Sequence, residues 1–208
     1  MNLIRRPFTY SYFNITLILI GVNALIFALQ KMSPDVTYIF AMTPVLVLRG
    51  CVWQFLTYMF AHANFSHIFF NMLALFVFGT QTERHMGSKE FLVYYLVTGI
   101  FAGFFSFIIF LFTGAARVPL LGASGAIFAV QLAYAAFFPN SVLYIWGILP
   151  LRAPVMVLVF TAIEMISMIF GVSNGVAHLT HIAGFGFGWL YFLLRFRLNP
   201  LRMMIGRR

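Results

Sequence analysis

Charged residues are scarce in this sequence. Only 8% of its 208 residues are charged and 62% are hydrophobic, whereas roughly 25% of residues are charged in soluble domains. Such a chain has too little polar surface to enclose a water-soluble core, so we exclude a soluble globular protein. Cysteine is almost absent as well. Cys51 stands alone, which excludes an internal disulfide framework.

Several other signals are also missing. The net charge of +9 does not indicate a nucleic-acid partner, because the basic residues separate hydrophobic stretches and form no face interleaved with aromatic side chains. The sequence contains no internal repeat, no low-complexity tract and no nucleotide-binding motif. We therefore expect one domain over residues 1–208, with no separate soluble part and no cofactor.

Long hydrophobic runs are abundant. Five stretches carry no charged residue: 7–30, 53–82, 91–116, 118–151 and 165–194. Each is long enough to cross a bilayer, which takes about 20 helical residues. The Pro139-Asn140 pair divides the fourth stretch, and the Gly-, Ser- and Asn-rich segment 171–175 divides the fifth. The pattern predicts an all-α polytopic membrane protein with six transmembrane helices, near residues 11–30, 66–83, 90–113, 123–138, 151–170 and 176–195.

Basic residues predict how this bundle is oriented. Six spans place both termini on one side, and of the 13 Lys and Arg residues only Lys31, Arg49 and Arg117 fall on the other side. Cytoplasmic loops carry the excess of Lys and Arg, so we expect both termini in the cytoplasm and the protein in the plasma (inner) membrane. The apolar start is too long for a signal peptide and has no cleavage site, so we expect a retained anchor. The apolar connection 31–65 is expected to lie in the outer interface.

A few polar side chains fall within or beside these spans, where each needs a partner or a function. They are His62, His67, Asn71, Ser124, Glu164, His178 and His181. Asn71 follows His67 by four residues, so both side chains project from one helical face and their N–H groups can converge on one atom. A hydrogen-bonded pair that joins two helices is the alternative interpretation.

Ser124 lies in the sequence Gly122-Ala123-Ser124-Gly125, where glycines allow a sharp turn before a helix begins. At a helix N-terminus the free backbone N–H groups and the helix dipole favour a developing anion, as acyl transfer requires. A serine that only caps the helix would give the same pattern.

His181 precedes a row of small residues on the sixth span. Small residues at helical spacing let helices approach closely in lipid. The matching residues are Gly184 and Gly188 on the sixth span and Gly125, Ala129 and Ala133 on the fourth. Close packing would bring His181 within hydrogen-bond distance of Ser124, which needs a base to become a nucleophile. A histidine satisfied within the core would not explain the small residues.

A metal site is the competing interpretation of the histidines. His178 and His181 could combine with His62 and His67 to offer four nitrogen ligands. The sequence lacks the His-Glu-x-x-His pattern of a zinc protease, the carboxylates of an iron site and a nearby cysteine. The two pairs are also four spans apart, so we predict no metal.

Three motifs together resemble the rhomboid family of intramembrane serine proteases. His62-x-x-x-x-His67-x-x-x-Asn71, Gly122-Ala123-Ser124-Gly125 and His181-Ile182-Ala183-Gly184 appear in the family's order over nearly the whole chain. The resemblance implies that Ser124 is the nucleophile, His181 the general base and acid, and His67 and Asn71, with the Ser124 backbone N–H, the oxyanion donors. It assigns supporting roles to His62, Gly122, Gly125, Phe128, Gly184 and Gly188.

The resemblance implies a serine endopeptidase with a Ser/His dyad. Its substrates would be single-span or polytopic membrane proteins, cut near the outer face of the bilayer without metal or cofactor, and membrane lipids would surround it. A substrate helix must unwind locally, because its amides are already hydrogen-bonded. The alternatives are a catalytically silent rhomboid-like protein that binds membrane clients and, with less support from the sequence, a small transporter or channel.

Two positions depart from the family pattern, one further element matches it, and Glu164 is not explained by its motifs. Gln54 follows Trp53 where many members have Trp-Arg, and Gln lacks the charged fork that would anchor the loop. Phe128 replaces a Tyr of some members, but a phenyl ring can still stack on the imidazole. Glu83-x-x-x-Gly87 resembles a structural element of the family. Glu164 is expected to make a structural hydrogen bond, and no acidic residue is expected to orient His181.

Overall fold

The computed structural model of the chain describes residues 8–145, 147–169 and 176–206. All six segments predicted to span the membrane contain helices. The helices are α1 (Ile15–Met32), the continuous run of α5 (Phe65–Ala74), the π-helical η3 (Leu75–Gly79) and α6 (Thr80–Met86), α7 (Ser88–Phe112), α8 (Ser124–Phe137), α9 (Ala153–Ile169) and α10 (Val176–Tyr191), which the π-helical η4 (Phe192–Phe196) continues. The predicted break at 171–175 lies outside the described residues.

Helix length distinguishes these segments. Among the described residues, α1 and α7 are long and apolar enough to cross a membrane alone, and the bent pair Gln54–Phe60 and Phe65–Met86 makes a third candidate. α8 and α9 are shorter apolar helices. A set of six crossings therefore remains a prediction.

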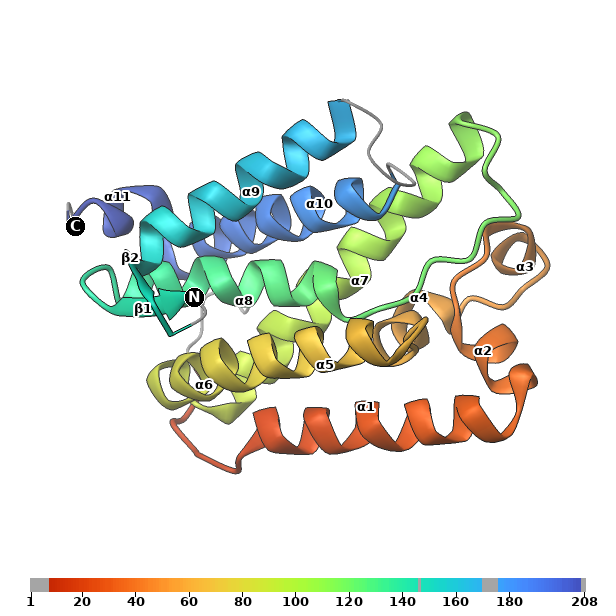
Figure 1. Ribbon diagram of the computed structural model, residues 1–208, viewed down its shortest axis with the longest axis horizontal. Helices are drawn as coiled ribbons and strands as arrows, with labels where there is room; N and C mark the ends of the chain where they lie inside the picture. Colours follow the sequence, from red (N-terminus) through yellow and green to blue (C-terminus); the bar gives the residue numbers. More distant parts are fainter. Residues whose placement is uncertain (1–7, 146, 170–175, 207–208) are drawn as a thin grey trace.

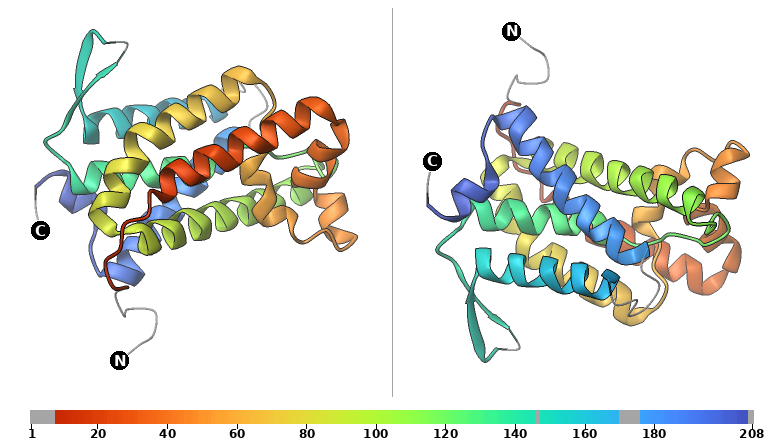
Figure 2. Two further views of the ribbon diagram at one scale, coloured as in Figure 1. Left: turned by 90° about the horizontal axis from the view of Figure 1, so that it is seen from below. Right: turned by 90° about the horizontal axis from the view of Figure 1, so that it is seen from above.

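Helix α8 lies at the centre of the bundle, as Figures 1 and 2 show. It contacts α5, α6, α7, α9 and α10, while α1 packs along the far side of α5 and α6. Nearly all of α8 is buried, and many of its buried residues are alanines, including Ala126, Ala129 and Ala133. Because these side chains are small, the surrounding helices can approach the α8 backbone closely.

The exterior of the bundle is apolar. Leu17, Ile18 and Leu25 of α1 and Phe101 and Phe104 of α7 are exposed. An aqueous surface rarely carries apolar side chains at this density, so this exterior suits a lipid environment.

The connection between α1 and α5 contains four short helices: α2 (Pro34–Phe40), α3 (Pro44–Leu48), α4 (Gln54–Thr57) and the 3-10 helix η2 (Tyr58–Phe60). Backbone hydrogen bonds tie it to the segment that leads into α8. Met42 and Leu120 exchange two such bonds, of 2.8 and 2.9 Å, and the Gly122 N–H donates to the Tyr58 carbonyl at 2.9 Å. The connection therefore braces the chain just before Ser124.

Gln54 anchors this connection, which answers the question that the missing Arg raised about how the loop is held. Its side chain is 1% exposed and its amide nitrogen donates to the carbonyls of Tyr38 and Ile39 at 3.1 and 3.3 Å. Its oxygen accepts from the Thr43 N–H at 3.1 Å, while the Trp53 indole donates to Ile39 at 3.2 Å. A neutral amide suffices here because every partner is a backbone group.

The all-α prediction needs one correction. After the predicted turn at Pro139 and Asn140, strands β1 (Val142–Ile145) and β2 (Leu149–Arg152) form an antiparallel hairpin, with Val142 paired to Arg152. The sequence did not predict this hairpin. A short apolar run has no periodicity that distinguishes a strand of four residues from a helix. A short helix, α11 (Pro200–Met204), also follows η4.

Glu83 joins α1 to the rest of the bundle. Its carboxylate accepts hydrogen bonds from the backbone N–H groups of Ile15 and Thr16 at 2.7 and 2.8 Å, and from the hydroxyls of Thr16 and Ser88 at 2.7 and 2.5 Å. The first amides of a helix have no partner within the helix, so this carboxylate caps α1 from a neighbouring helix. These bonds agree with the structural role expected for Glu83.

Candidate active site

Ser124 and His181 meet between the N-terminal turn of α8 and helix α10. The Ser124 Oγ lies 2.7 Å from the His181 Nε2, which is hydrogen-bond distance. Helix α8 begins at Ser124, and Gly122 two residues earlier has φ of 120°. Residues with a Cβ rarely adopt that backbone conformation, so Gly122 provides the sharp turn. The structure thus places the hydroxyl against an imidazole at a helix N-terminus.

Glycines allow this contact. A Cβ atom on Gly184 would lie 1.9 Å from the Gly125 carbonyl oxygen, and one on Gly188 would lie 2.9 Å from the Ala129 Cβ. Helices α8 and α10 therefore approach at the small residues that the sequence analysis paired. The close contact lies one residue beyond Ser124 and three beyond His181.

Phe128 packs on the base. Its ring stacks on the His181 imidazole with 4.7 Å between ring centroids and 7° between the ring planes. Phe128 lies one helical turn after Ser124, so α8 supplies both the hydroxyl and the ring that restricts the imidazole. The expected stacking is confirmed.

His67 and Asn71 line the other side of the Ser124 turn. A Cβ on Gly122 would lie 2.7 Å from the His67 Nε2, closer than real Cβ contacts come, and 3.8 Å from the Asn71 Nδ2, which is ordinary contact. Asn64 accepts from the backbone N–H of His67 at 2.8 Å and thereby caps α5. The predicted pair therefore faces the serine turn from one helical face.

Both side chains can donate a hydrogen bond into the site. The His67 Nδ1 accepts from the Ala63 N–H at 3.5 Å, a long contact that favours the tautomer with the proton on Nε2, the atom that faces Gly122. The Asn71 Nδ2 is buried without a hydrogen-bond partner among the described residues. This donor is therefore available to a group that enters the site.

His62 packs beneath His67. The two rings contact edge to face with 5.0 Å between centroids, and His62 is 2% exposed. Burial, and secondarily the neighbouring His67, lowers the pKa of His62 from 6.5 to about 4, so this ring is neutral near pH 7. His62 supports His67 and does not reach the serine turn in any contact that the structure describes.

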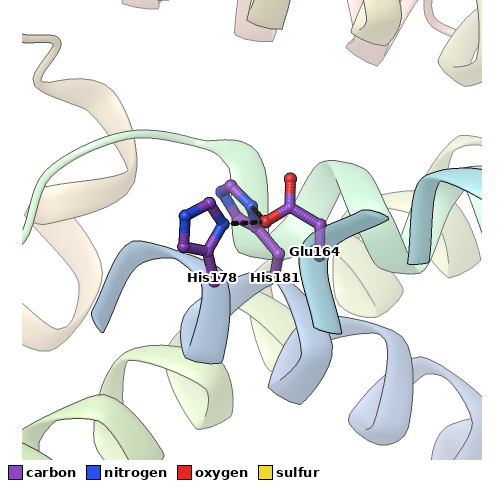
Figure 3. A group of neighbouring side chains, drawn as sticks. All are labelled: Glu164, His178 and His181. Carbon is purple, nitrogen blue, oxygen red and sulfur yellow. Dashed lines mark hydrogen bonds and ion pairs between the residues drawn. The ribbon is translucent and has the colours of Figure 1, made fainter. Parts of the chain in front are cut away.

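Glu164 contacts the base, although the sequence offered no obvious acidic residue to orient His181 and indicated only a structural hydrogen bond for Glu164. One oxygen, Oε2, bonds the Nδ1 of His178 and lies 3.0 Å from the Nδ1 of His181 (Figure 3). Glu164 comes from α9 and both histidines from α10. Sequence spacing could not reveal this contact, because it depends on how two helices are rotated against each other.

These three side chains form a candidate metal site that differs from the four histidines considered in the sequence analysis. The proposed group of four histidines does not come together: His62 and His67 pack with each other, whereas Glu164, His178 and His181 have ligand atoms within 4.8 Å of one another. Two imidazoles and one carboxylate are a ligand set that zinc accepts. The same atoms are also within ion-pair distance without a metal, so the contacts described above need none.

A cavity of about 620 Å³ opens at the serine. Its lining includes Ser124, His181, His67 and Asn71, and its walls carry apolar side chains of α5, α8 and α9 such as Phe70, Phe128, Met156 and Phe160. The cavity is thus mostly apolar, with polar groups at the serine and a further one from Gln131, about two helical turns along α8. This is the usual composition of a site that binds a largely apolar ligand in a defined orientation.

Comparison with known proteins identifies the family. The rhomboid domain model matches residues 49–198, which include all the site residues above. The chain belongs to the rhomboid family. Rhomboid protease GlpG of Haemophilus influenzae is 31% identical over 191 residues, which cover 90% of this chain and 94% of that protein.

Other rhomboid relatives match shorter segments. Rhomboid protease GluP of Bacillus subtilis is 41% identical over 83 residues, 40% of this chain and 15% of that protein. Rhomboid protease AarA of Providencia stuartii is 43% identical over 61 residues, 29% of this chain and 22% of that protein. Relatives named as rhomboid proteases, together with the apolar helices, support an integral membrane protein of a protease family.

Proposed function

We propose that this rhomboid protein is an active intramembrane serine endopeptidase that cleaves transmembrane segments of other proteins near the outer face of the bilayer. The observation that carries this proposal is the 2.7 Å contact between the Ser124 Oγ and the His181 Nε2. A serine hydroxyl is a poor nucleophile until a base within about 2.6–3.2 Å can take its proton. This contact meets that requirement in the resting protein.

The proposed reaction is acyl transfer. The His181 Nε2 takes the Ser124 proton as Oγ attacks the scissile carbonyl carbon, and the carbonyl oxygen becomes an oxyanion. His181 then gives the proton to the leaving amide nitrogen, the C–N bond breaks, and an ester on Ser124 remains. His181 then takes a proton from a water molecule as the water oxygen attacks the ester; the C–Oγ bond breaks, His181 returns the proton to Ser124, and the new carboxyl end is released.

Three donors would stabilise the oxyanion. The Asn71 Nδ2, the His67 Nε2 and the backbone N–H of Ser124, one of the first amides of α8, all lie around the serine turn. Donors fixed in place before the reaction stabilise developing charge at little reorganisation cost. The unused capacity of Asn71 in the resting site would be filled at this step.

The cavity favours a membrane-protein substrate, either single-span or polytopic. Its walls are mostly apolar, and the peptide groups of an unwound substrate segment can form hydrogen bonds with the polar groups around the serine. A helix that enters intact has its amides satisfied internally, so cleavage requires a substrate segment that unwinds easily. With both termini in the cytoplasm, as the basic residues predict, α5 and α8 begin toward the outer face.

A fluorophosphonate probe tests the nucleophile. We expect the wild-type protein in detergent to be labelled, Ser124→Ala to show no labelling, and His181→Ala to be labelled at least a hundredfold more slowly. Asn140→Ala, which changes an exposed residue far from the site, serves as the control and should be labelled normally.

A panel of single-span substrates tests the reaction. Cleavage by the wild type that disappears in Ser124→Ala would support the endopeptidase. If the folded wild-type protein neither reacts with the probe nor cleaves any substrate, but retains bound membrane proteins, it is a client-binding rhomboid-like protein instead.

A further inference from the structure

Glu164 lies on the opposite side of His181 from the nucleophile. Its Oε2 is 3.0 Å from the Nδ1 of His181, whose Nε2 is 2.7 Å from the Ser124 Oγ. Figure 3 shows the carboxylate directed at the two imidazoles of α10. The base therefore has a carboxylate beside one ring nitrogen and a hydroxyl beside the other.

This arrangement determines which ring nitrogen can act as a base. A neutral imidazole carries one proton, and a carboxylate beside Nδ1 favours the tautomer with the proton on Nδ1. The Nε2 is then unprotonated and can accept the proton of Ser124. With the opposite tautomer the Nε2–H would point at the hydroxyl, and no proton could be taken.

The contact is of a kind that strengthens during the reaction. The Nδ1 of His181 has no linear hydrogen bond among the described residues, although the Glu164 oxygen is 3.0 Å away. In the resting state the carboxylate therefore acts mainly through its charge. When His181 takes the Ser124 proton it becomes a cation, and its attraction to Glu164 increases at that moment. Interactions that are stronger in the transition state than in the ground state accelerate the chemical step.

His178 fixes the carboxylate in this place. It lies three residues before His181, on the same face of α10, and its Nδ1 bonds the same oxygen of Glu164. The Glu164 side chain is 18% exposed, so the contact between this carboxylate and the two imidazoles is only partly accessible to water. Phe128 stacks on His181 from α8, so the imidazole is held by α8 and by the carboxylate of α9.

We propose that Glu164 is a positioning residue for His181, so that this protein works with a Ser124, His181 and Glu164 triad and not with a dyad. This inference rests on the proposed endopeptidase function. It assigns no contact with the substrate to Glu164, which acts only through the imidazole. His178 has the secondary role of holding the carboxylate.

The first experiment compares Glu164→Gln with the wild type in detergent, with a single-span substrate. We expect kcat to fall on the order of 10–100-fold with KM little changed, because proton transfer is impaired and binding is not. Glu164→Asp keeps the charge on a shorter side chain and should recover part of the loss. The control is Thr161→Val, which removes a hydroxyl of α9 one turn away that bonds only the Val157 carbonyl among the contacts described.

A structural role for Glu164 would give a different result. In that case Glu164→Gln would lower the thermal unfolding temperature, leave the kcat of the folded fraction unchanged and show no recovery with Asp. That outcome would overturn the proposal. Activity that is lost with EDTA and restored by Zn²⁺ would also overturn it, by assigning Glu164, His178 and His181 to a metal ion.

The second experiment tests whether Glu164 acts through His181. Fluorophosphonate labelling rates are measured for Glu164→Gln, His181→Ala and the double variant. We expect Glu164→Gln to slow labelling when His181 is present and to have no further effect in the His181→Ala background. The effects of substitutions at residues that act as a unit are not additive. Additive losses would contradict the triad. If the wild type shows no labelling at Ser124, the proposed endopeptidase function itself is overturned. If the wild type and Glu164→Gln are labelled at the same rate, only the triad is overturned.

Discussion

Glu83 and Glu164 are carboxylates of two different helices, and their surroundings differ sharply. Glu83 is 0% exposed and accepts four hydrogen bonds from α1 and α7, two of them from backbone amides. Glu164 is 18% exposed and its described contacts are the imidazoles of His178 and His181. A carboxylate saturated with fixed donors holds helices together, whereas one that faces titratable rings can respond when a proton moves.

The same contrast extends to the neighbourhoods of the two residues. Around Glu83, the two backbone amides and two hydroxyls that face the carboxylate all donate hydrogen bonds to it. Around Ser124 the Asn71 Nδ2 and the His181 Nδ1 are buried without a linear partner in the described part of the chain. The first region should therefore govern stability and the second the rate of reaction. Three variants below test this division, and a fourth tests the pH dependence that His62 adds to stability; they run from the largest expected effect to the smallest.

Gly184→Ala should damage both properties at once, because it acts where α8 and α10 meet. The added Cβ would lie 1.9 Å from the Gly125 carbonyl oxygen, so the helices must separate. We expect a loss of about 3 kcal/mol in stability and more than a hundredfold in kcat/KM, since a displacement of about 1 Å is enough for that loss of rate. Gly186→Ala is the matched control, because a Cβ there meets no atom within 4 Å. Equal behaviour of the two variants would disprove the close approach.

Asn71→Ala should affect the rate alone. Removal of one oxyanion donor costs about 10²–10³-fold in kcat. Its Nδ2 has no partner in the described resting structure, so the unfolding temperature should stay close to that of the wild type. Steady-state kinetics and a thermal scan of the same sample check both points, with Asn140→Ala as the control. A kcat within threefold of the wild type would remove Asn71 from the oxyanion site.

Glu83→Gln should show the opposite pattern. The amide cannot accept all four hydrogen bonds, so buried donors of α1 and α7 lose their partner at a cost of about 3 kcal/mol. We expect a lower unfolding temperature and an unchanged kcat for the fraction that remains folded, the reverse of Glu164→Gln. If Glu83→Gln lowered kcat without destabilising the protein, the division between the two carboxylates would be wrong.

His62 should make the stability of the protein depend on pH. Its pKa is about 4 in the folded protein and 6.5 when exposed, so the unfolded chain binds a proton first as pH falls. Stability is then lost between pH 6.5 and about 4, by up to about 3 kcal/mol, and none of this loss occurs above pH 6.5. Unfolding in SDS measured from pH 7.5 to 5 should show the loss in the wild type, and His62→Gln should show less of it. Parallel curves would exclude His62 as the source.

Much of this arrangement was predictable from the sequence. Hydrophobic runs and breakers located the helices, because segments that cross lipid must be long, apolar and internally hydrogen-bonded. Ser124 and His181 could be paired because small residues at helical spacing follow each of them. Two such rows indicate that the two helices pack closely. His67 and Asn71 were placed on one face by helical periodicity alone.

Other features depend on contacts that sequence spacing does not encode. Glu164 reaches His181 through the relative rotation of α9 and α10, which a linear pattern cannot give. The β1–β2 hairpin is hidden in an apolar run, and the anchoring of Gln54 depends on backbone carbonyls 15 and 16 residues away. In each case the partner is a distant group whose position only the folded chain determines.

The bonds that link the connection after α1 to the chain before Ser124 have a consequence for sequence drift. They join backbone atoms of Met42 to Leu120 and of Tyr58 to Gly122, and none of them requires a particular side chain at Met42, Tyr58 or Leu120. These bonds persist through side-chain exchanges at those three positions, although Tyr58 also donates its hydroxyl to the Gly99 carbonyl at 2.6 Å, so its exchange would cost that bond.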